Sequence, residues 1–293
     1  MFLNHFNYFA PQSAAEVLDL LGRLGSRAKM LAGGTDLLVL MKDKVLAPEY
    51  LIDIANIAEF KGIAYEPGKG AVIGAATKIA EIEHSAIIRE KYFALHQAAG
   101  ALGSVQIRNM ATIGGNSCNA SPAAETPTPL VALGAEVVLA SLTGERKLPL
   151  EQFILDNRKT ALAEGEILTK FILPEPAPRS AGRYSHIGLR DAMEIDAVNM
   201  AVNLVLEEDD LTLKDLKLVM GSVAPRPLVS VEVPGLLSGR EFSDTLVHEA
   251  SRAASGEATP ISDIRASAEY RQEVVAVLAR RLLYEAFAAA KEV

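Results

Sequence analysis

The sequence predicts an α+β fold in two domains, the second built from an antiparallel sheet and helices. Its 293 residues are enough for two domains with a substantial core, and patterns typical of helices and of strands are mixed along the chain. The three prolines of Pro174–Pro178 cannot continue a helix or a central strand, so they indicate a boundary. We therefore expect a first domain over residues 1–175 and a second over residues 180–293.

The first elements are predicted from capping residues and apolar spacing. Ser13 and Glu16 form a capping box that opens a helix, and Gly25 ends it. A short strand over 29–32 follows, and Asp36 stands at the N-cap position of the next helix. The other elements expected in the first domain are strands over 50–54, 71–74 and 136–140, and helices over 92–99 and 127–133.

The second domain is predicted to begin with a hairpin and to end with helices. Strands over 202–207 and 213–219 flank the acidic turn Glu208–Asp210. Two helical segments close the chain, the longer over about 266–291. We interpret the apolar stripe on that helix as core packing; it consists of Val274, Val277, Leu278, Leu282 and Phe287.

Composition argues against several classes of function. The net charge of −8 disfavours nucleic-acid binding, which needs clustered Lys and Arg. No apolar run approaches the ~20 residues that span a bilayer, and Met1–His5 lacks the pattern of a secretory signal, so we expect a cytoplasmic protein. The only cysteine, Cys118, excludes an intrachain disulfide or a thiolate-held iron–sulfur cluster, and five scattered histidines do not have the spacing of a zinc site.

Two glycine-centred loops, Ala32–Leu37 and Thr112–Asn116, are the strongest functional signal. Each offers backbone amides with little side-chain cover, which is what the pyrophosphate of a dinucleotide needs. Neither loop fits G-x-G-x-x-G or G-x-x-x-x-G-K-[ST], so the Rossmann fingerprint and the P-loop are both disfavoured. Taken alone, either loop is also compatible with an ordinary turn.

Both loops lie within longer motifs. The first is AGGTDLL at 32–38; the second is QIRNMATIGGN at 106–116, followed by ASPAAE at 120–125 and PLVALGA at 129–135. A further run, TPISDIRASAEYR, occupies 259–271. Together, in this order, the motifs resemble the FAD-binding medium subunit of the molybdenum hydroxylases. That family includes the flavoprotein subunits of xanthine dehydrogenase and of aerobic carbon monoxide dehydrogenase.

The resemblance implies a two-subdomain FAD-binding domain of the xanthine dehydrogenase/vanillyl-alcohol-oxidase type, with subdomains at about 1–57 and 58–175. Each subdomain then contributes one loop to the FAD pyrophosphate. The cofactor-binding residues implied are Met30, Leu31, Ala32, Gly33, Gly34, Thr35, Asp36, Leu37, Leu102, Thr112, Ile113, Gly114, Gly115, Asn116, Glu125, Leu168 and His186. The glycines allow close backbone approach, and Thr35, Thr112 and Asn116 can add side-chain hydrogen bonds. Leu168 matches a position that packs near the isoalloxazine.

Two positions depart from the pattern of the family. Glu125 stands where the family has Asp near the flavin, which keeps a hydrogen-bond acceptor but makes it one methylene longer. His186 stands where the family often has a Lys close to the flavin, although it also reads as a surface residue. Our hypothesis is that His186 makes flavin reduction pH-sensitive. Parallel midpoint potentials of wild type and His186→Ala between about pH 5.5 and about pH 8.5 would refute it.

Other candidate residues have simpler interpretations. Cys118 is expected to pack in the interior. Asp191, Glu194 and Asp196 form an acidic cluster that we assign to a solvated face or a helix start in preference to a metal site. Arg108 and Asn109 are expected to position the second loop.

The resemblance implies an electron-transfer subunit without a catalytic residue or a metal of its own. A large subunit with a molybdenum cofactor and a small subunit with [2Fe–2S] clusters would be its partners, in a heterotrimer that is single or dimerised. Electrons would pass through FAD to an acceptor such as NAD, a quinone or oxygen. The alternative is a self-sufficient FAD oxidoreductase with its own substrate site, for which the second domain looks small. A flavin-free scaffold is a third reading, disfavoured by the intact glycine loops.

Overall fold

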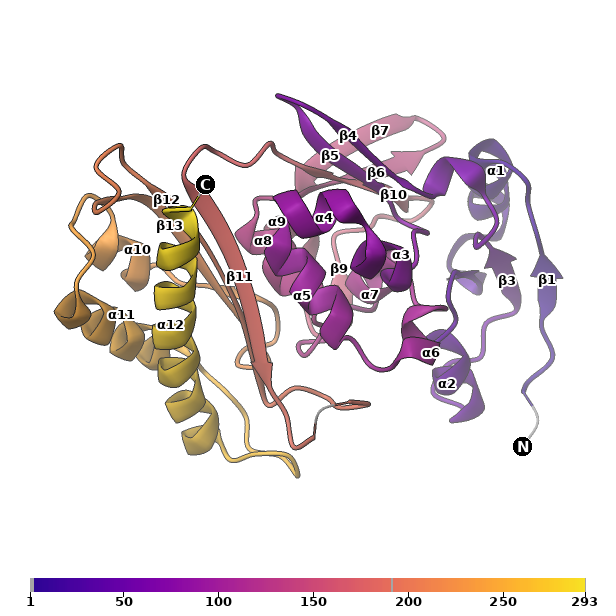
Figure 1. Cartoon of the computed structure of the whole chain (residues 1–293). Helices are drawn as coiled ribbons and strands as arrows, with labels where there is room; N and C mark the ends of the chain where they lie inside the picture. The colour runs from indigo at the N-terminus through magenta and orange to yellow at the C-terminus, as the bar shows by residue number, and fades with distance from the viewer. Residues whose placement is uncertain (1–2, 191, 293) are drawn as a thin grey trace.

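The chain begins with a small parallel sheet in the computed structural model, which describes residues 3–190 and 192–292 (Figure 1). The strand order is β1 (Asn7–Phe9), β3 (Tyr50–Asp53), β2 (Ala28–Leu31), and the helices between them are α1 (Ala14–Leu24) and α2 (Leu37–Lys42). Short 3₁₀ turns lie at η1 (Gly25–Arg27) and η2 (Ala58–Phe60).

Capping explains both ends of α1. The Ser13 hydroxyl accepts a hydrogen bond from the Glu16 amide at 3.3 Å, and Gly25 ends the helix with a φ of 57°. Both predictions are confirmed. The prediction for Asp36 is only half right: α2 begins directly after it, but its backbone is already helical and its side chain caps nothing. Asp36 makes a long-range contact instead, described below.

The middle of the chain forms a five-stranded antiparallel sheet with a group of short helices. The strands, in sheet order, are β4 (Ile63–Glu66), β5 (Gly70–Gly74), β10 (Ile167–Leu173), β6 (Glu136–Ser141) and β7 (Gly144–Pro149). The helices are α3 (Ile79–His84), α4 (Ala86–Lys91), α5 (Phe93–Ala101), α6 (Val105–Arg108), α7 (Ile113–Asn119), α8 (Pro127–Ala132) and α9 (Leu150–Phe153). A two-stranded ribbon, β8 (Ile154–Asp156) and β9 (Lys159–Thr160), completes this part. The elements predicted here are confirmed to within two residues at each end.

The last part is a four-stranded antiparallel sheet covered by helices. Its order is β11 (Ser180–Ile187), β12 (Val198–Leu206), β13 (Leu213–Gly221), β14 (Leu228–Val229), followed by α10 (Glu232–Leu237), α11 (Asp244–Glu257) and α12 (Ala268–Ala290). The predicted hairpin is β12–β13, and the two predicted helices are α11 and α12. On α12, Val274, Leu278 and Leu282 are buried as expected.

The sheet of β11–β14 lies between two sets of helices. Helices α11 and α12 cover one side, and α5 and α8 from the middle of the chain lie against the other (Figure 1). Tyr184, Ala201 and Val219 of this sheet accordingly belong to the same apolar cluster as the middle part. The division into domains at Pro174–Pro178 stays a prediction, and its two sides share a packed interface.

Two further observations bear on function. No helix within residues 3–190 and 192–292 is long and apolar enough to cross a membrane. In the same described ranges, no group of three or more His, Cys, Asp or Glu side chains is arranged to hold a metal ion.

Candidate functional site

The first glycine loop joins β2 to α2 and carries unused backbone donors. A Cβ on Gly33 would lie 2.1 Å from the Met110 carbonyl oxygen, and Gly34 has a φ of +72°, so both positions favour glycine. Among the described residues, the amides of Gly33, Gly34, Thr35 and Asp36 find no hydrogen-bond acceptor. Consecutive unpaired amides of this kind form a site for an anion.

The second loop is built differently from the prediction. Its residues form the start of α7, where the Thr112 hydroxyl caps the helix by accepting from the Gly115 amide at 3.1 Å. The Gly114 amide donates to the Ala75 carbonyl at 2.8 Å, and that of Ile113 to Thr77 at 3.1 Å. The amides of residues 113–116 are thus engaged within the protein, so the expectation that they are available to a phosphate is wrong. That the residues of this loop bind the cofactor stays a prediction.

Glycine is nevertheless required in the second loop. A Cβ on Gly114 would lie 2.6 Å from the Ala75 carbonyl oxygen, so the residue lets α7 sit directly against the start of α3 and the end of β5. The polar group that the loop can offer a ligand is the side chain of Asn116. Its Oδ1 accepts from the Thr126 hydroxyl at 2.6 Å, which leaves its amide donors to point elsewhere.

The two loops meet, as predicted. The Asn119 side chain, at the end of α7, donates to Asp36 Oδ1 at 3.0 Å. Arg158 adds a positive charge here: its backbone donates to the Ala120 carbonyl at 2.9 Å. Although Asp36 is exposed, the surrounding protein raises the pKa of its carboxyl, and the charge of Arg158 opposes that rise. Neither Asn119 nor Arg158 was predicted as a site residue.

Glu125 lies in the segment between α7 and α8, with only 9% of its surface exposed. Burial, together with the negative charge of Asp196, raises the pKa of its carboxyl to about 8. A hydrogen bond from its own backbone amide and the charge of His186 oppose the rise, and Asp36 adds to it. The structure thus brings the predicted residues Glu125 and His186 together with Asp196, a residue that we had assigned to a solvated face.

That assignment of Asp196 is wrong. The residue is 3% exposed and accepts from His186 Nδ1 at 2.8 Å, from Asn199 Nδ2 at 3.1 Å and from the Tyr184 hydroxyl at 3.4 Å. Burial, and then the Asp196 and Glu125 charges, raise the pKa of Tyr184 well above its usual range. Glu194 is not on a solvated face either: only 11% of its side chain is exposed, and it pairs with Arg190 at 3.3 Å. Asp191 lies outside the described residues.

A hydrogen-bonded chain connects this acidic pair to the middle of the molecule. Asn199 Oδ1 accepts from the Thr128 hydroxyl of α8 at 2.7 Å. Opposite Asn199, a Cβ on Gly221 would lie 2.2 Å from that same oxygen, so glycine is needed for β13 to pass. No spacing in the sequence indicates this contact, because it joins residues 71 positions apart.

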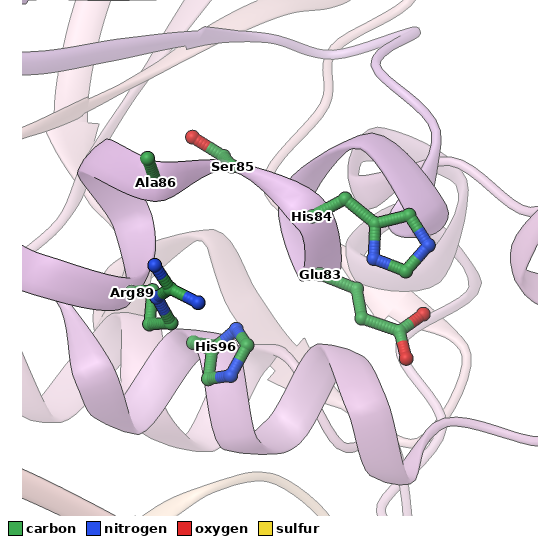
Figure 2. Close-up of a pocket in the computed structure, with 6 residues that line it drawn as sticks. All are labelled: Glu83, His84, Ser85, Ala86, Arg89 and His96. Carbon is green, nitrogen blue, oxygen red and sulfur yellow. The ribbon is translucent and has the colours of Figure 1, made fainter.

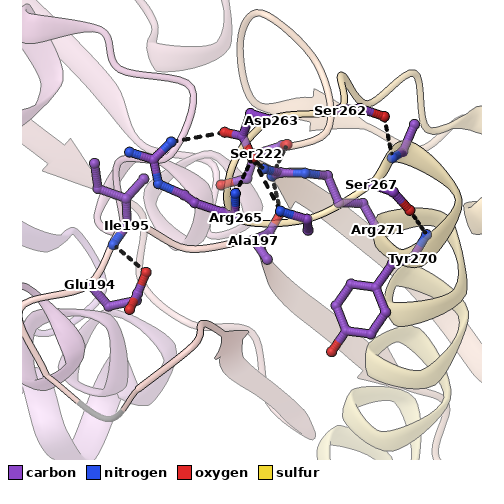
Figure 3. Close-up of polar contacts among 12 residues, drawn as sticks. Glu194, Ile195, Ala197, Ser222, Ser262, Asp263, Arg265, Ser267, Tyr270 and Arg271 are labelled. Atoms are coloured by element: carbon purple, nitrogen blue, oxygen red, sulfur yellow. Dashed lines mark hydrogen bonds and ion pairs between the residues drawn. The ribbon is translucent and has the colours of Figure 1, made fainter.

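Arg271 holds the segment that carries Asp196. Its guanidinium is buried and donates to the carbonyls of Ala197 and Ser222 and to Asp263 Oδ1 at 2.8 Å (Figure 3). Hydrogen bonds from Arg265 and Arg271 lower the pKa of Asp263, whereas burial acts in the opposite direction. The TPISDIRASAEYR motif thus ties the start of α12 to the residue that follows Asp196.

Several of the other predicted residues belong to the helices and strands around the two glycine loops. Leu102 is buried at the end of α5, and its carbonyl accepts from Arg108, which also forms an ion pair with Glu83 at 2.7 Å. Arg108 therefore positions its loop, as expected.

Leu168 is buried in β10, Met30 and Leu31 belong to β2, and Leu37 is the first residue of α2. Cys118 packs against the middle cluster, and burial raises the pKa of its thiol to about 12.

A pocket of about 330 Å³ lies elsewhere, along α3, α4 and α5 (Figure 2). It is lined by Glu83, His84, Ser85, Ala86, Arg89 and His96. None of these is a predicted cofactor residue, and the Glu83 carboxylate is already engaged by Arg108. This pocket therefore does not coincide with the predicted cofactor site, whose place at the glycine loops stays a prediction.

The fold and the glycine loops define a flavoprotein. Residues 4–176 match the family described as the FAD binding domain in molybdopterin dehydrogenase, and residues 183–286 match the CO dehydrogenase flavoprotein C-terminal domain. The chain therefore belongs to the family of FAD-binding subunits of molybdopterin dehydrogenases, and its cofactor is FAD.

Similarity to individual proteins extends over the whole length. The chain is 32% identical to the carbon monoxide dehydrogenase medium chain of Hydrogenophaga pseudoflava, covering 97% of each. It is 30% identical to the xanthine dehydrogenase FAD-binding subunit of Escherichia coli O157:H7, covering 97% of this chain and 98% of that one. A solved structure of the Hydrogenophaga pseudoflava carbon monoxide dehydrogenase superposes with a TM-score of 0.93 at 32% identity, covering 98% of this chain and 99% of that one. The chain is thus an oxidoreductase subunit with the same α+β architecture.

Proposed function

We propose that this chain transfers electrons within a molybdenum hydroxylase. In this proposal its FAD takes electrons from [2Fe–2S] clusters of a small partner subunit and passes them to an external acceptor such as NAD or a quinone. The observation that carries the proposal is the row of unpaired amides at Gly33–Asp36, in a chain whose family binds FAD. A large subunit would hold the molybdenum cofactor and oxidise the substrate, in a cytoplasmic heterotrimer.

The residues present fit FAD. The first loop and Arg158 suit a pyrophosphate, because the unpaired amides can donate hydrogen bonds and the guanidinium adds a positive charge nearby. Asn116 can donate from the second loop. Glu125 and His186 lie together at the C-terminal sheet and are proposed to face the flavin ring, with Leu168 packed behind.

When bound, the isoalloxazine supplies the redox chemistry, so the chain needs no bond-making acid or base of its own. Its residues bind the two ends of the cofactor and keep them in one orientation. The Asp36–Asn119 hydrogen bond fixes the phosphate end, and the Asp196–His186 pair fixes the polar surroundings of the other end.

The names of the relatives support a complex in which different subunits hold the FAD and the molybdenum cofactor. They are called the medium chain of a carbon monoxide dehydrogenase and the FAD-binding subunit of a xanthine dehydrogenase. The solved Hydrogenophaga pseudoflava enzyme is described as lacking the Mo-pyranopterin moiety of its molybdenum cofactor, which ties that protein to molybdenum chemistry. We assign the same kind of complex to this chain.

Purification of the complex from the native source tests the proposal. We expect two partner subunits, one with molybdenum and one with iron–sulfur clusters, and bleaching of the flavin band near ~450 nm when the complex turns over its substrate. If the isolated chain oxidises an organic substrate by itself, the self-sufficient oxidoreductase is the better reading.

A further inference from the structure

The pocket along α3, α4 and α5 is lined by several hydrogen-bond donors. Its volume of about 330 Å³ lies within the range of small-ligand sites, about 300–1,000 Å³. Figure 2 shows the Arg89 guanidinium of α4 and the His96 imidazole of α5 together on one side of the space, with Glu83 of α3 on the other. Ser85, between α3 and α4, adds a hydroxyl. Three separate segments of the chain thus bring donors to one place.

These donors are not used within the protein. In the part of the chain that the structure describes, the Arg89 guanidinium has no hydrogen-bond acceptor, and His96 Nδ1 is buried without a partner. Ser85 Oγ accepts from the Ile88 amide at 3.4 Å, which leaves its O–H free to donate. Buried polar atoms are normally hydrogen-bonded, so the unpaired Nδ1 points to a ligand that supplies the missing acceptor.

The charges around the pocket favour an anion. Glu83 is the only acid that lines it, and both of its carboxylate oxygens accept from Arg108, at 2.7 and 3.1 Å. That negative charge is therefore already compensated. Arg89 has no carboxylate partner among residues 3–190 and 192–292, so its positive charge is available to a ligand.

We propose that this pocket binds a phosphate group, either free or carried by a small metabolite. Arg89 donates two parallel hydrogen bonds to it, and His96 and Ser85 each add one from another segment. Donors from several directions suit the tetrahedral oxygens of a phosphate, whereas a planar carboxylate matches the guanidinium alone. The inference goes beyond FAD binding, because none of these residues is a predicted cofactor residue.

Isothermal titration of the FAD-loaded full chain with inorganic phosphate and with glycerol phosphate tests the proposal. FAD is included because the unpaired amides of the first glycine loop are a second place at which an anion can bind. We expect one phosphate for each chain, bound about tenfold more weakly by Arg89→Ala and about 3- to 10-fold more weakly by His96→Leu. Arg89→Lys keeps the charge and should lose less than Arg89→Ala. Tighter binding of glycerol phosphate than of phosphate would identify a metabolite as the source, and equal binding the free ion.

Matched controls lie on α11. Arg252→Ala removes an exposed arginine that has no ion-pair partner among the described residues, and His248→Leu removes an exposed histidine. Both variants should bind phosphate like wild type. Nuclear magnetic resonance adds a direct readout: of the five histidines, His96 should shift its ring signals on addition of phosphate and His248 should not.

Three results would overturn the inference. The first is a folded wild-type chain that binds no phosphate at about 10 mM. The second is a folded Arg89→Ala variant that binds it as tightly as wild type, since the ion then lies elsewhere. The third is equally tight binding of acetate, because no tetrahedral anion is then selected. A chain that takes up no FAD would overturn the proposed function instead, and the comparison of Arg89→Ala with wild type would still decide the phosphate site.

Discussion

Asn119 donates a hydrogen bond to Asp36 across 3.0 Å, and this single contact joins the helix of the second glycine loop to the end of the first. The two residues are 83 positions apart. Since the amides of Gly33–Asp36 are unpaired and those of residues 113–116 are not, we propose that α7 serves to hold the first loop in a shape that suits an anion.

A double-mutant cycle on this pair tests that conclusion. Asp36→Ala and Asn119→Ala should each weaken FAD binding several-fold, and the double variant should be little worse than either one, with a coupling energy of about 0.5–1.5 kcal/mol. Isothermal titration with FAD measures all four proteins. Fully additive losses would show that the two loops act independently.

Gly33→Ala should lose both stability and FAD affinity. The new methyl group would lie 2.1 Å from the Met110 carbonyl oxygen, and neither backbone can move without opening the contact between the loops. We expect a loss of about 1–3 kcal/mol in unfolding free energy, measured by urea denaturation. Gly256→Ala, in α11 with open space around the new methyl group, is the matched control and should be neutral or slightly stabilising.

The sequence was most informative where structure is local. The capping box at Ser13, the stop at Gly25 and the hairpin around Glu208–Asp210 were all predictable, because each depends on residues close together in the chain. The motifs also predicted that the two glycine loops lie together, and the Asn119–Asp36 hydrogen bond joins them. The motifs could not show that the amides of Gly114 and Gly115 donate hydrogen bonds within the protein, because the acceptors of these amides depend on how α7 packs.

The surroundings of the other site residues depend on tertiary contacts. Asp36 resembles a helix cap in the sequence, yet its side chain bonds to Asn119. Asp196 lies in a charged stretch that reads as solvated, yet side chains of β11 and β12 bond to it and Arg271 holds the next carbonyl. Burial also changes the chemistry of Glu125, from an expected acceptor to an acid with a pKa of about 8. None of these outcomes follows from local patterns.

Removal of the Arg271 guanidinium should be strongly destabilising. Arg271→Ala leaves Asp263 and the carbonyls of Ala197 and Ser222 without their buried donor, and we expect a loss of about 3–5 kcal/mol in unfolding free energy. Arg265→Ala removes the more exposed partner of Asp263 and should cost less than about 1 kcal/mol. Similar losses in the two variants, measured by chemical denaturation, would contradict the assigned role of Arg271.

The stability of the FAD-free chain should decrease with rising pH in a way that depends on Glu125. The folded chain keeps this proton up to about pH 8, whereas the unfolded chain releases it near the ordinary value of 4.5. Between these values the unfolded state binds fewer protons, so the contribution of Glu125 to unfolding free energy falls as pH rises, by on the order of 5 kcal/mol in total.

Glu125→Gln should remove this dependence and be more stable than wild type at pH 8. Thermal unfolding at several pH values measures the difference between the two proteins. A wild-type curve that stays parallel to that of Glu125→Gln from pH 5 to pH 8 would show that the carboxyl is not held neutral.

Retention of FAD by the purified full chain tests the central claim most directly. After incubation with FAD and gel filtration, the account predicts about one FAD for each folded chain, with a flavin absorption band near ~450 nm, and a marked loss of that FAD in Gly33→Ala but not in Gly256→Ala. A wild-type chain that is folded by circular dichroism and retains no FAD, or a Gly33→Ala variant that is folded and retains as much as wild type, would contradict it.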